Sequence, residues 1–322
     1  MNENHVTVQL KLKDHEGIDD IRFHNKCHHC DKELSVYWCH DCKKSMCQDC
    51  INRHRGSRHT EDHIVIVHVH DMYSLDYKFH CKVLGDISDI KVLPDELLVI
   101  AVNTGKQLLT FDITGQQQHT IPLPGTSYCI SVVDNNTVAV TLYTFTLLSP
   151  NTVAIVDVRQ RRVIEHIDMR MAINGIMYRE KQLFVCCADK TIKVVNMSWK
   201  ITHIIPVSLP MYICGGEAGR IYYTDWNKLY CINTVGDMLF TFTDPNMNEP
   251  CGITTDDEGH VLVICRGSKN VLRISPDGEQ SQVIIAQVLT SCHSSYTNIC
   301  YDSQSKSVVI GYDGYVFVYK KV

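Results

Sequence analysis

Six of the sixteen cysteines in this 322-residue chain lie within one 24-residue stretch, arranged as three C-x2-C pairs. The pairs are Cys27 with Cys30, Cys39 with Cys42, and Cys47 with Cys50. A C-x2-C pair brings two thiolates within reach of one tetrahedral ion, and structural zinc takes four Cys or His ligands. Three such pairs and two histidines supply eight ligands, so the spacing predicts two zinc ions.

The third pair follows the second by only four residues, too few for a separate core. We therefore expect interleaved sites, one formed by Cys27, Cys30, Cys47 and Cys50, and the other by Cys39, Cys42 and two histidines. A module of fewer than about 40 residues buries too little apolar surface to offset its ordering entropy, so zinc should supply most of its folding free energy. Sites closed by protein ligands lack the open position of a catalytic zinc, which predicts structural metal and no catalytic residue.

The cysteine spacing, the aromatic pair Tyr37–Trp38 and the histidines that follow resemble the B-box zinc finger, and the type 1 box more than type 2. This resemblance implies that His54 and His63 are the last two ligands. His59 is the alternative to His63, because its interval from His54 also fits some boxes. A ZZ-type finger is the rival zinc fold. Solvated polar roles are expected for His24, His28, His29 and His40.

The remaining ten cysteines are scattered, mostly within β-like apolar runs, where a free thiol packs as a small hydrophobic group. We expect core thiols at Cys81, Cys129, Cys186, Cys187, Cys214, Cys231, Cys251, Cys265, Cys292 and Cys300. The sequence shows neither a basic start followed by an apolar run nor about 18 consecutive apolar residues, so it predicts no secretion and no membrane span. A cytoplasmic protein with reduced cysteines is the expectation.

From about residue 85 the chain consists of short β-rich runs separated by Asp, Asn and Gly. Residues 219–244 and 259–285 share one order of β runs and turns, and related segments give six copies with a period of about 40 residues. One strand position is occupied in turn by Phe111, Val156, Val195, Ile232, Ile274 and Val318. A four-stranded sheet with its turns needs about this length, so the repeat predicts a six-bladed β-propeller.

The sixth copy ends at Val322, directly after its third strand. Residues 77–84 alternate like a strand, so we expect them to pair with the last blade and close the ring. The predicted fold is mainly β, with a tail at residues 1–21, a two-zinc B-box module at 22–68 and the propeller at 77–322.

The phrases ITTDDEGHVLVI and VLRISPDGE resemble NHL-type propeller repeats, and a B-box ahead of such a propeller resembles the NHL class of the tripartite-motif (TRIM) family. Two departures limit what the resemblance implies. No cysteine precedes Cys27, so a RING finger is not expected in this sequence. The roughly 15 residues after His63 are also too few for the three or four heptads of a stable coiled coil.

These features predict a non-enzymatic adaptor whose zinc module and propeller dock other proteins. The alternatives are an accessory subunit in ubiquitin ligation with a RING-bearing partner, and an RNA-binding regulator acting through the propeller. A net charge of -5 does not favour RNA, nor do 19 Lys and Arg against 23 Asp and Glu in residues 85–322. The basic residues that could serve RNA are Arg159, Arg161, Arg162, Arg170 and Arg179.

Propellers that act as calcium-dependent hydrolases place carboxylates around the central channel, which makes an enzyme a further possibility. Asp256, Asp257 and Glu258 are the candidates in this sequence. They belong to a DDEG run, however, and Asp and Gly there have the ordinary chemistry of a hairpin turn. Catalysis is therefore not expected.

Overall fold

A computed structural model describes residues 29–30, 37–39, 41–42, 44–46, 50, 53–54, 65–67, 72–83, 85–143, 151–286, 288 and 297–322. The chain divides into two compact units, Met1–His70 and Asp71–Val322.

The described part of the first unit contains a small antiparallel sheet in the order β2-β1-β3. Its strands are β1 (Tyr37–Cys39), β2 (Lys44–Met46) and β3 (Val65–Val67). Cys39 ends β1 opposite Lys44 of β2 and Val65 of β3. The tight β1–β2 hairpin therefore places the central C-x2-C pair at its turn.

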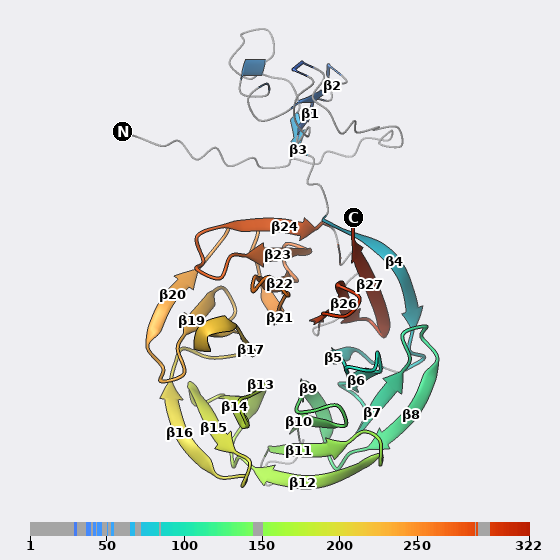
Figure 1. The fold of residues 1–322 in the computed structure, drawn as a ribbon, viewed down its shortest axis with the longest axis vertical. Helices are drawn as coiled ribbons and strands as arrows, with labels where there is room; N and C mark the ends of the chain where they lie inside the picture. The colour runs from blue at the N-terminus through green and yellow to red at the C-terminus, as the bar shows by residue number, and fades with distance from the viewer. Residues whose placement is uncertain are drawn as a thin grey trace. The chain divides into compact units, whose positions relative to one another are not determined.

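The second unit is a six-bladed β-propeller, as the repeat predicted, and each described blade is a four-stranded antiparallel sheet (Figure 1). The first three blades comprise β5 (Ile87–Val92), β6 (Leu98–Val102), β7 (Gln107–Phe111) and β8 (Gln117–Pro122); β9 (Thr126–Val132), β10 (Thr137–Tyr143), β11 (Thr152–Asp157) and β12 (Arg162–Asp168); and β13 (Ile173–Arg179), β14 (Gln182–Cys187), β15 (Thr191–Asn196) and β16 (Ile201–Pro206). The fourth and fifth comprise β17 (Tyr212–Gly215), β18 (Ile221–Thr224), β19 (Leu229–Ile232) and β20 (Met238–Phe242), with the 3-10 turn η1 (Glu217–Gly219); and β21 (Pro250–Thr255), β22 (Val261–Cys265), β23 (Asn270–Ile274) and β24 (Ser281–Ile285). The sixth comprises β25 (Asn298–Asp302), β26 (Ser307–Tyr312), β27 (Tyr315–Lys321) and β4 (Tyr73–His80).

The sixth blade is completed by β4, which precedes all the other propeller strands in the sequence. This strand pairs antiparallel with β27, with Tyr73 opposite Lys321 and His80 opposite Tyr315. The closing strand therefore begins four residues before the predicted residue 77 and ends at His80. It ends there because Lys82 and Gly85 adopt left-handed backbone angles, with φ of 55° and 117°, which turn the chain into β5.

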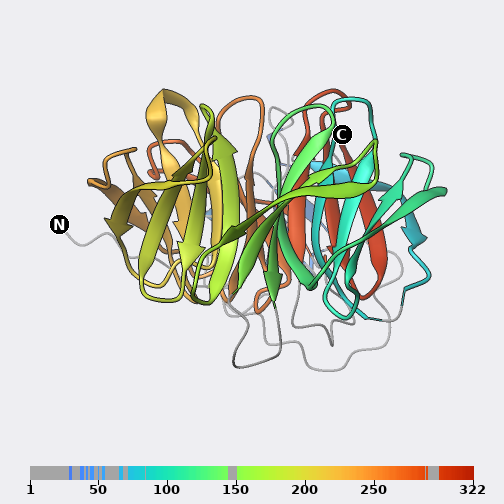
Figure 2. The same ribbon diagram turned by 90° about the horizontal axis from the view of Figure 1, so that it is seen from below.

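Burial explains why a repeat of about 40 residues forms a blade. The six positions aligned by the repeat all lie on third strands, and each is buried. Second and third strands are buried along most of their length, as in β6 and β22, whereas the rim strands expose most residues, as in β8 and β16. Seen from the side, the strands run between two faces of a flattened ring (Figure 2).

Side chains of β4 also contact the first blade, so this strand joins the two ends of the ring. The Tyr77 hydroxyl donates a 2.6 Å hydrogen bond to the carbonyl of Ile113, and the Phe79 and Phe111 ring centroids are 5.5 Å apart. Gly115 in the β7–β8 turn has φ +86°, and a Cβ there would lie 2.6 Å from the Phe79 ring. Glycine is therefore required both by the backbone and by the ring packed on it.

Nine of the ten scattered cysteines lie in the described propeller, and none of these nine forms a disulfide. Eight are buried and Cys214 is partly buried, which confirms the predicted core thiols. Burial raises the pKa of Cys81 to about 12 and that of Cys187 to about 11. These thiols are therefore protonated and poorly reactive at neutral pH. Cys292 lies outside the described residues.

Candidate metal centre

The β1–β2 hairpin presents Cys39 and Cys42 on the same side of its turn. Cys39 is fully buried at the end of β1, and the backbone N–H of Cys42 donates to its Sγ over 3.4 Å. A backbone N–H aimed at a ligating sulfur is the kind of outer contact that fixes a metal ligand's position. The local fold thus orders this C-x2-C pair for one ion.

His54 approaches both sulfurs from a different part of the sequence. Its Nε2 lies 3.3 Å from Cys39 Sγ and 3.8 Å from Cys42 Sγ, and the three potential ligand atoms all lie within 4.8 Å of one another. Zinc bond lengths of about 2.3 Å to sulfur and about 2.0 Å to nitrogen, at a tetrahedral angle, place S and N about 3.5 Å apart. The two observed distances bracket this value, so the residues present fit a tetrahedral zinc ion.

The electrostatics of the pair favour a cation. Burial, and then the neighbouring Cys39 sulfur, raise the pKa of the Cys42 thiol. Two thiolates this close repel each other, whereas a divalent cation between them stabilises both in the deprotonated form. Zinc binding at this place would therefore release protons, and its affinity would fall as the pH is lowered.

Two of the four cysteines predicted for the other ion are described. Cys30 and Cys50 line one cavity together with His29, Arg53 and His54. The Arg53 guanidinium donates to Cys50 Sγ over 3.8 Å, and His29 is exposed, as expected for a solvated residue. The remaining predicted ligands and the other solvated histidines lie outside the described residues, namely Cys27, Cys47, His59, His63, His24, His28 and His40.

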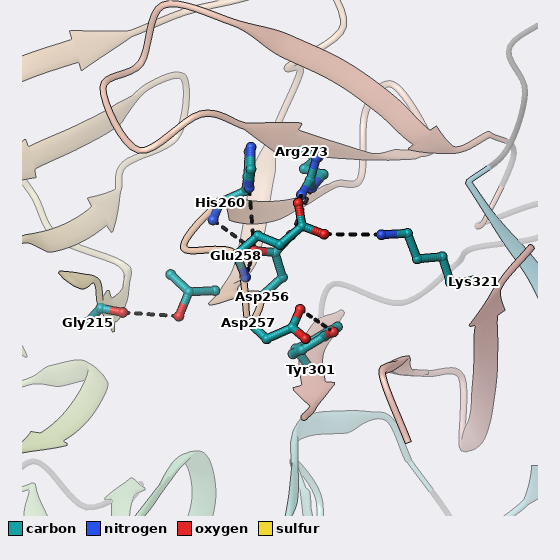
Figure 3. A network of polar contacts seen from close by, with 9 residues as sticks. Gly215, Asp256, Asp257, Glu258, His260, Arg273, Tyr301 and Lys321 are labelled. Atoms are coloured by element: carbon teal, nitrogen blue, oxygen red, sulfur yellow. Dashed lines mark hydrogen bonds and ion pairs between the residues drawn. The ribbon is translucent and has the colours of Figure 1, made fainter. Parts of the chain in front are cut away.

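The acidic run at residues 256–258 forms the β21–β22 turn and bonds to neighbouring strands (Figure 3). The Asp256 carboxylate is buried, accepts backbone N–H groups of Glu258 and His260, and pairs with Arg273 Nε at 2.8 Å. Arg273 Nη2 also pairs with Glu258 at 2.7 Å. Asp256 thus has the predicted hairpin role, because it accepts N–H groups of its own turn.

This turn also connects the fifth blade to both neighbouring blades. Asp257 accepts a 2.8 Å hydrogen bond from the Tyr301 hydroxyl, and Glu258 pairs with Lys321 at 3.1 Å, both in the sixth blade. On the other side, the Thr255 hydroxyl donates to the carbonyl of Gly215 in the fourth blade over 3.1 Å (Figure 3). We call Asp256, Asp257, Glu258, Arg273, Tyr301 and Lys321 the inter-blade clasp.

Sequence reasoning missed Arg273, although a signal was present. It lies on a third strand one position before the aligned Ile274, where the other copies carry uncharged residues: Thr110, Ile155, Val194, Cys231 and Phe317. A single charge at an otherwise uncharged repeat position predicts a buried partner. Asp256 is that partner.

Four of the five arginines considered for RNA contact polar groups of the propeller. Arg159 pairs with Asp95, and Arg179 bonds Glu180 and the carbonyls of Gly216 and Arg220. Arg161 lies in the β11–β12 turn and Arg162 begins β12, whereas Arg170 follows β12 at the opposite face of the ring. The strand order therefore separates Arg170 from the other four arginines.

No family model matches this chain, and no curated protein sequence matches it. Among solved structures, a streptogramin B lyase is similar over 76% of this chain and 97% of its own, with a TM-score of 0.57 and 12% sequence identity. At this identity the likeness shows the propeller fold alone. In the described residues, no helix is both long and apolar enough to cross a membrane.

Proposed function

We propose that this protein is a zinc-stabilised, non-enzymatic adaptor, in which a B-box-type module and an NHL-like propeller dock other proteins. The observation that carries the proposal is the meeting of Cys39, Cys42 and His54 at distances suited to one zinc ion. These three residues belong to the ligand set that the B-box resemblance implies.

In this proposal Cys39, Cys42 and His54 hold the second zinc ion together with His63, or with His59 in its place. The ion ties the β1–β2 hairpin to the segment that carries His54, and Cys27, Cys30, Cys47 and Cys50 hold the other ion. Both ions act as structural cross-links of a module too small to be stable through its apolar core.

Two cysteines, one histidine and a bound water also form a known catalytic zinc site. A structural site with four protein ligands can be distinguished from it, because only the catalytic site holds a water. Cobalt(II) loaded into the module reports its own coordination by absorption. We expect a tetrahedral cobalt spectrum. It should stay the same when azide is added or when the pH is changed across the range in which a bound water would ionise. A spectrum that responds to azide or to pH through water ionisation would contradict the structural role.

For the propeller, the proposal rests on a rigid ring whose turns and rim strands are exposed. The similar lyase shows that this fold also supports enzymes, so the fold does not decide between binding and catalysis. The non-enzymatic reading is supported by the candidate carboxylates Asp256, Asp257 and Glu258, which are bound to Arg273, Tyr301 and Lys321.

Affinity capture from cells that express the protein tests the adaptor role. The full chain is compared with Cys39→Ser and with Cys300→Ala, a core-thiol control in the propeller. We expect a reproducible set of proteins, part of which is lost only with Cys39→Ser. Ubiquitin-loading activity in the captured material would support the ligation alternative, and salt-sensitive RNA without proteins would contradict the adaptor.

A further inference from the structure

A small cavity lies on the propeller axis, and its lining shares no residue with the inter-blade clasp. Its lining comes from all six innermost strands, and its polar members are Asp89 and Lys91 of β5, Tyr212 of β17 and Asn298 of β25. Its volume is about 20 Å³. A water-sized guest needs about 10 to 15 Å³ on this measure, so the cavity has room for one.

The first hydrogen-bond donor at the cavity is Lys91. Its ammonium donates to Asp89 Oδ1 over 2.6 Å and to the carbonyl of Ile90 over 3.2 Å. An ammonium carries three N–H donors, so one remains without an acceptor among the described residues. The side chain of Lys91 is 23% exposed and that of Asp89 only 3%, which is consistent with the lysine reaching the axis.

The Asp89 carboxylate is held firmly on the other side of this ion pair. It accepts the backbone N–H groups of Ile90 at 2.7 Å and Ile130 at 2.6 Å. With one positive and one negative group, the pair is neutral, so a guest needs to accept a hydrogen bond rather than to balance a charge.

The second donor is Tyr212, which lines the same cavity from a different blade. Its hydroxyl accepts a 3.4 Å hydrogen bond from Tyr128, and within the described chain its own O–H has no acceptor. A buried donor left without an acceptor costs about 1 to 3 kcal/mol. The Tyr212 O–H and the third N–H of the partly exposed Lys91 belong to residues that line one small cavity, which points to an acceptor between them.

We infer that the axial cavity binds one hydrogen-bond acceptor the size of a water molecule, held by the Lys91 ammonium and the Tyr212 hydroxyl. Water and a halide ion share this chemistry. The guest links β5 to β17 across the axis, and so connects the first blade to the fourth.

A high-resolution crystal structure of the full chain, grown with sodium bromide, tests this directly. We expect a density peak within hydrogen-bonding distance of Lys91 Nζ and Tyr212 Oη. An anomalous bromide signal at the peak identifies a halide site, and a peak without that signal identifies water. A cavity with no ordered density would overturn the inference.

A double-mutant cycle gives a second readout. Tyr212→Phe and Lys91→Met should each lower the melting temperature, and their combined effect should be smaller than the sum, because both remove the same guest. Tyr222→Phe is the matched control, since its buried hydroxyl bonds the carbonyl of Pro276 instead. Additive effects of Tyr212→Phe and Lys91→Met would contradict a shared guest. If Lys91→Met does not fold, the crystal grown with bromide tests the inference alone.

Discussion

The Glu258 carboxylate accepts a 3.1 Å hydrogen bond from Lys321 Nζ, which connects a turn of the fifth blade to the strand that receives β4. The other Glu258 oxygen bonds Arg273, and hydrogen bonds from Arg273 and Lys321 lower the pKa of this carboxyl below its usual 4.5. The inter-blade clasp therefore stabilises the ring next to the place where it closes.

Glu258→Gln should lower the free energy of unfolding by about 0.5 to 1 kcal/mol at pH 7, since both partners are partly solvent-exposed. A carboxyl with a lowered pKa in the fold stabilises above its unfolded pKa, and this contribution disappears as pH falls through the folded value. The difference in unfolding free energy between Glu258→Gln and the unaltered chain should thus be largest above about pH 4.5 and decrease at lower pH.

Urea unfolding between pH 3 and pH 7 measures this dependence. Glu279→Gln is the control, because Glu279 has no ion pair among the described residues. A loss with Glu258→Gln that stays constant down to pH 3 would show that the charge is not the cause.

Closure by β4 makes a second prediction. Phe79→Ala should cost about 2 to 3 kcal/mol, less than for a fully buried Phe, because the ring is half-buried against Phe111 and Gly115. Leu75→Ala on the same strand should have little effect, since Leu75 is 47% exposed. Thermal unfolding of both variants checks this.

Deleting residues 73–80 is the stronger version of the same test. The sixth blade would lose its rim strand, and the whole propeller should melt earlier in one transition. A deletion that leaves the melting temperature unchanged would mean that β4 does not close the ring.

The ion pair between the buried Asp89 and the partly exposed Lys91 makes a third prediction. Lys91→Met should destabilise the propeller by about 3 kcal/mol or more, because it leaves a buried carboxylate without its partner. Asp89→Leu combined with Lys91→Met should recover much of this loss. Lys228→Met, at an exposed site, is the control, and denaturant midpoints provide the comparison.

A chelator provides a fourth prediction, which separates the two units. Removing zinc should abolish the β1–β2–β3 sheet while the melting temperature of the propeller stays the same, since the described metal ligands all precede Asp71. Amide NMR resolves both parts in one sample. Loss of propeller signals together with those of the first unit would contradict this separation.

The repeat in the sequence was sufficient to predict six blades, because Phe111, Val318 and their counterparts recur at the interval of one four-stranded sheet. The start of the closing strand was harder to predict. Tyr73 to Asp76 continue the apolar alternation of Tyr77 to His80, so a local signal was present, but their partner strand β27 lies about 240 residues later.

Local pattern indicated the candidate Cys39–Cys42–His54 cluster better than the polar contacts of the propeller. Cys39 and Cys42 are set by a short spacing, whereas the Asp256–Arg273 pair joins the β21–β22 turn to β23. The Lys91–Tyr212 arrangement requires the ring to bring β5 and β17 to one axis. Comparison of the repeats marks Arg273 as unusual, but it does not identify Asp256 as its partner or bring Lys91 and Tyr212 together.

The central claim is that Cys39, Cys42 and His54 hold zinc. Native mass spectrometry of the full chain measures bound zinc directly, with Cys39→Ser and Cys300→Ala measured beside it. We predict two zinc ions in the unaltered chain and in Cys300→Ala, and fewer in Cys39→Ser. A chain purified with zinc supplied that carries none, or a Cys39→Ser variant that keeps the full amount, would contradict the account.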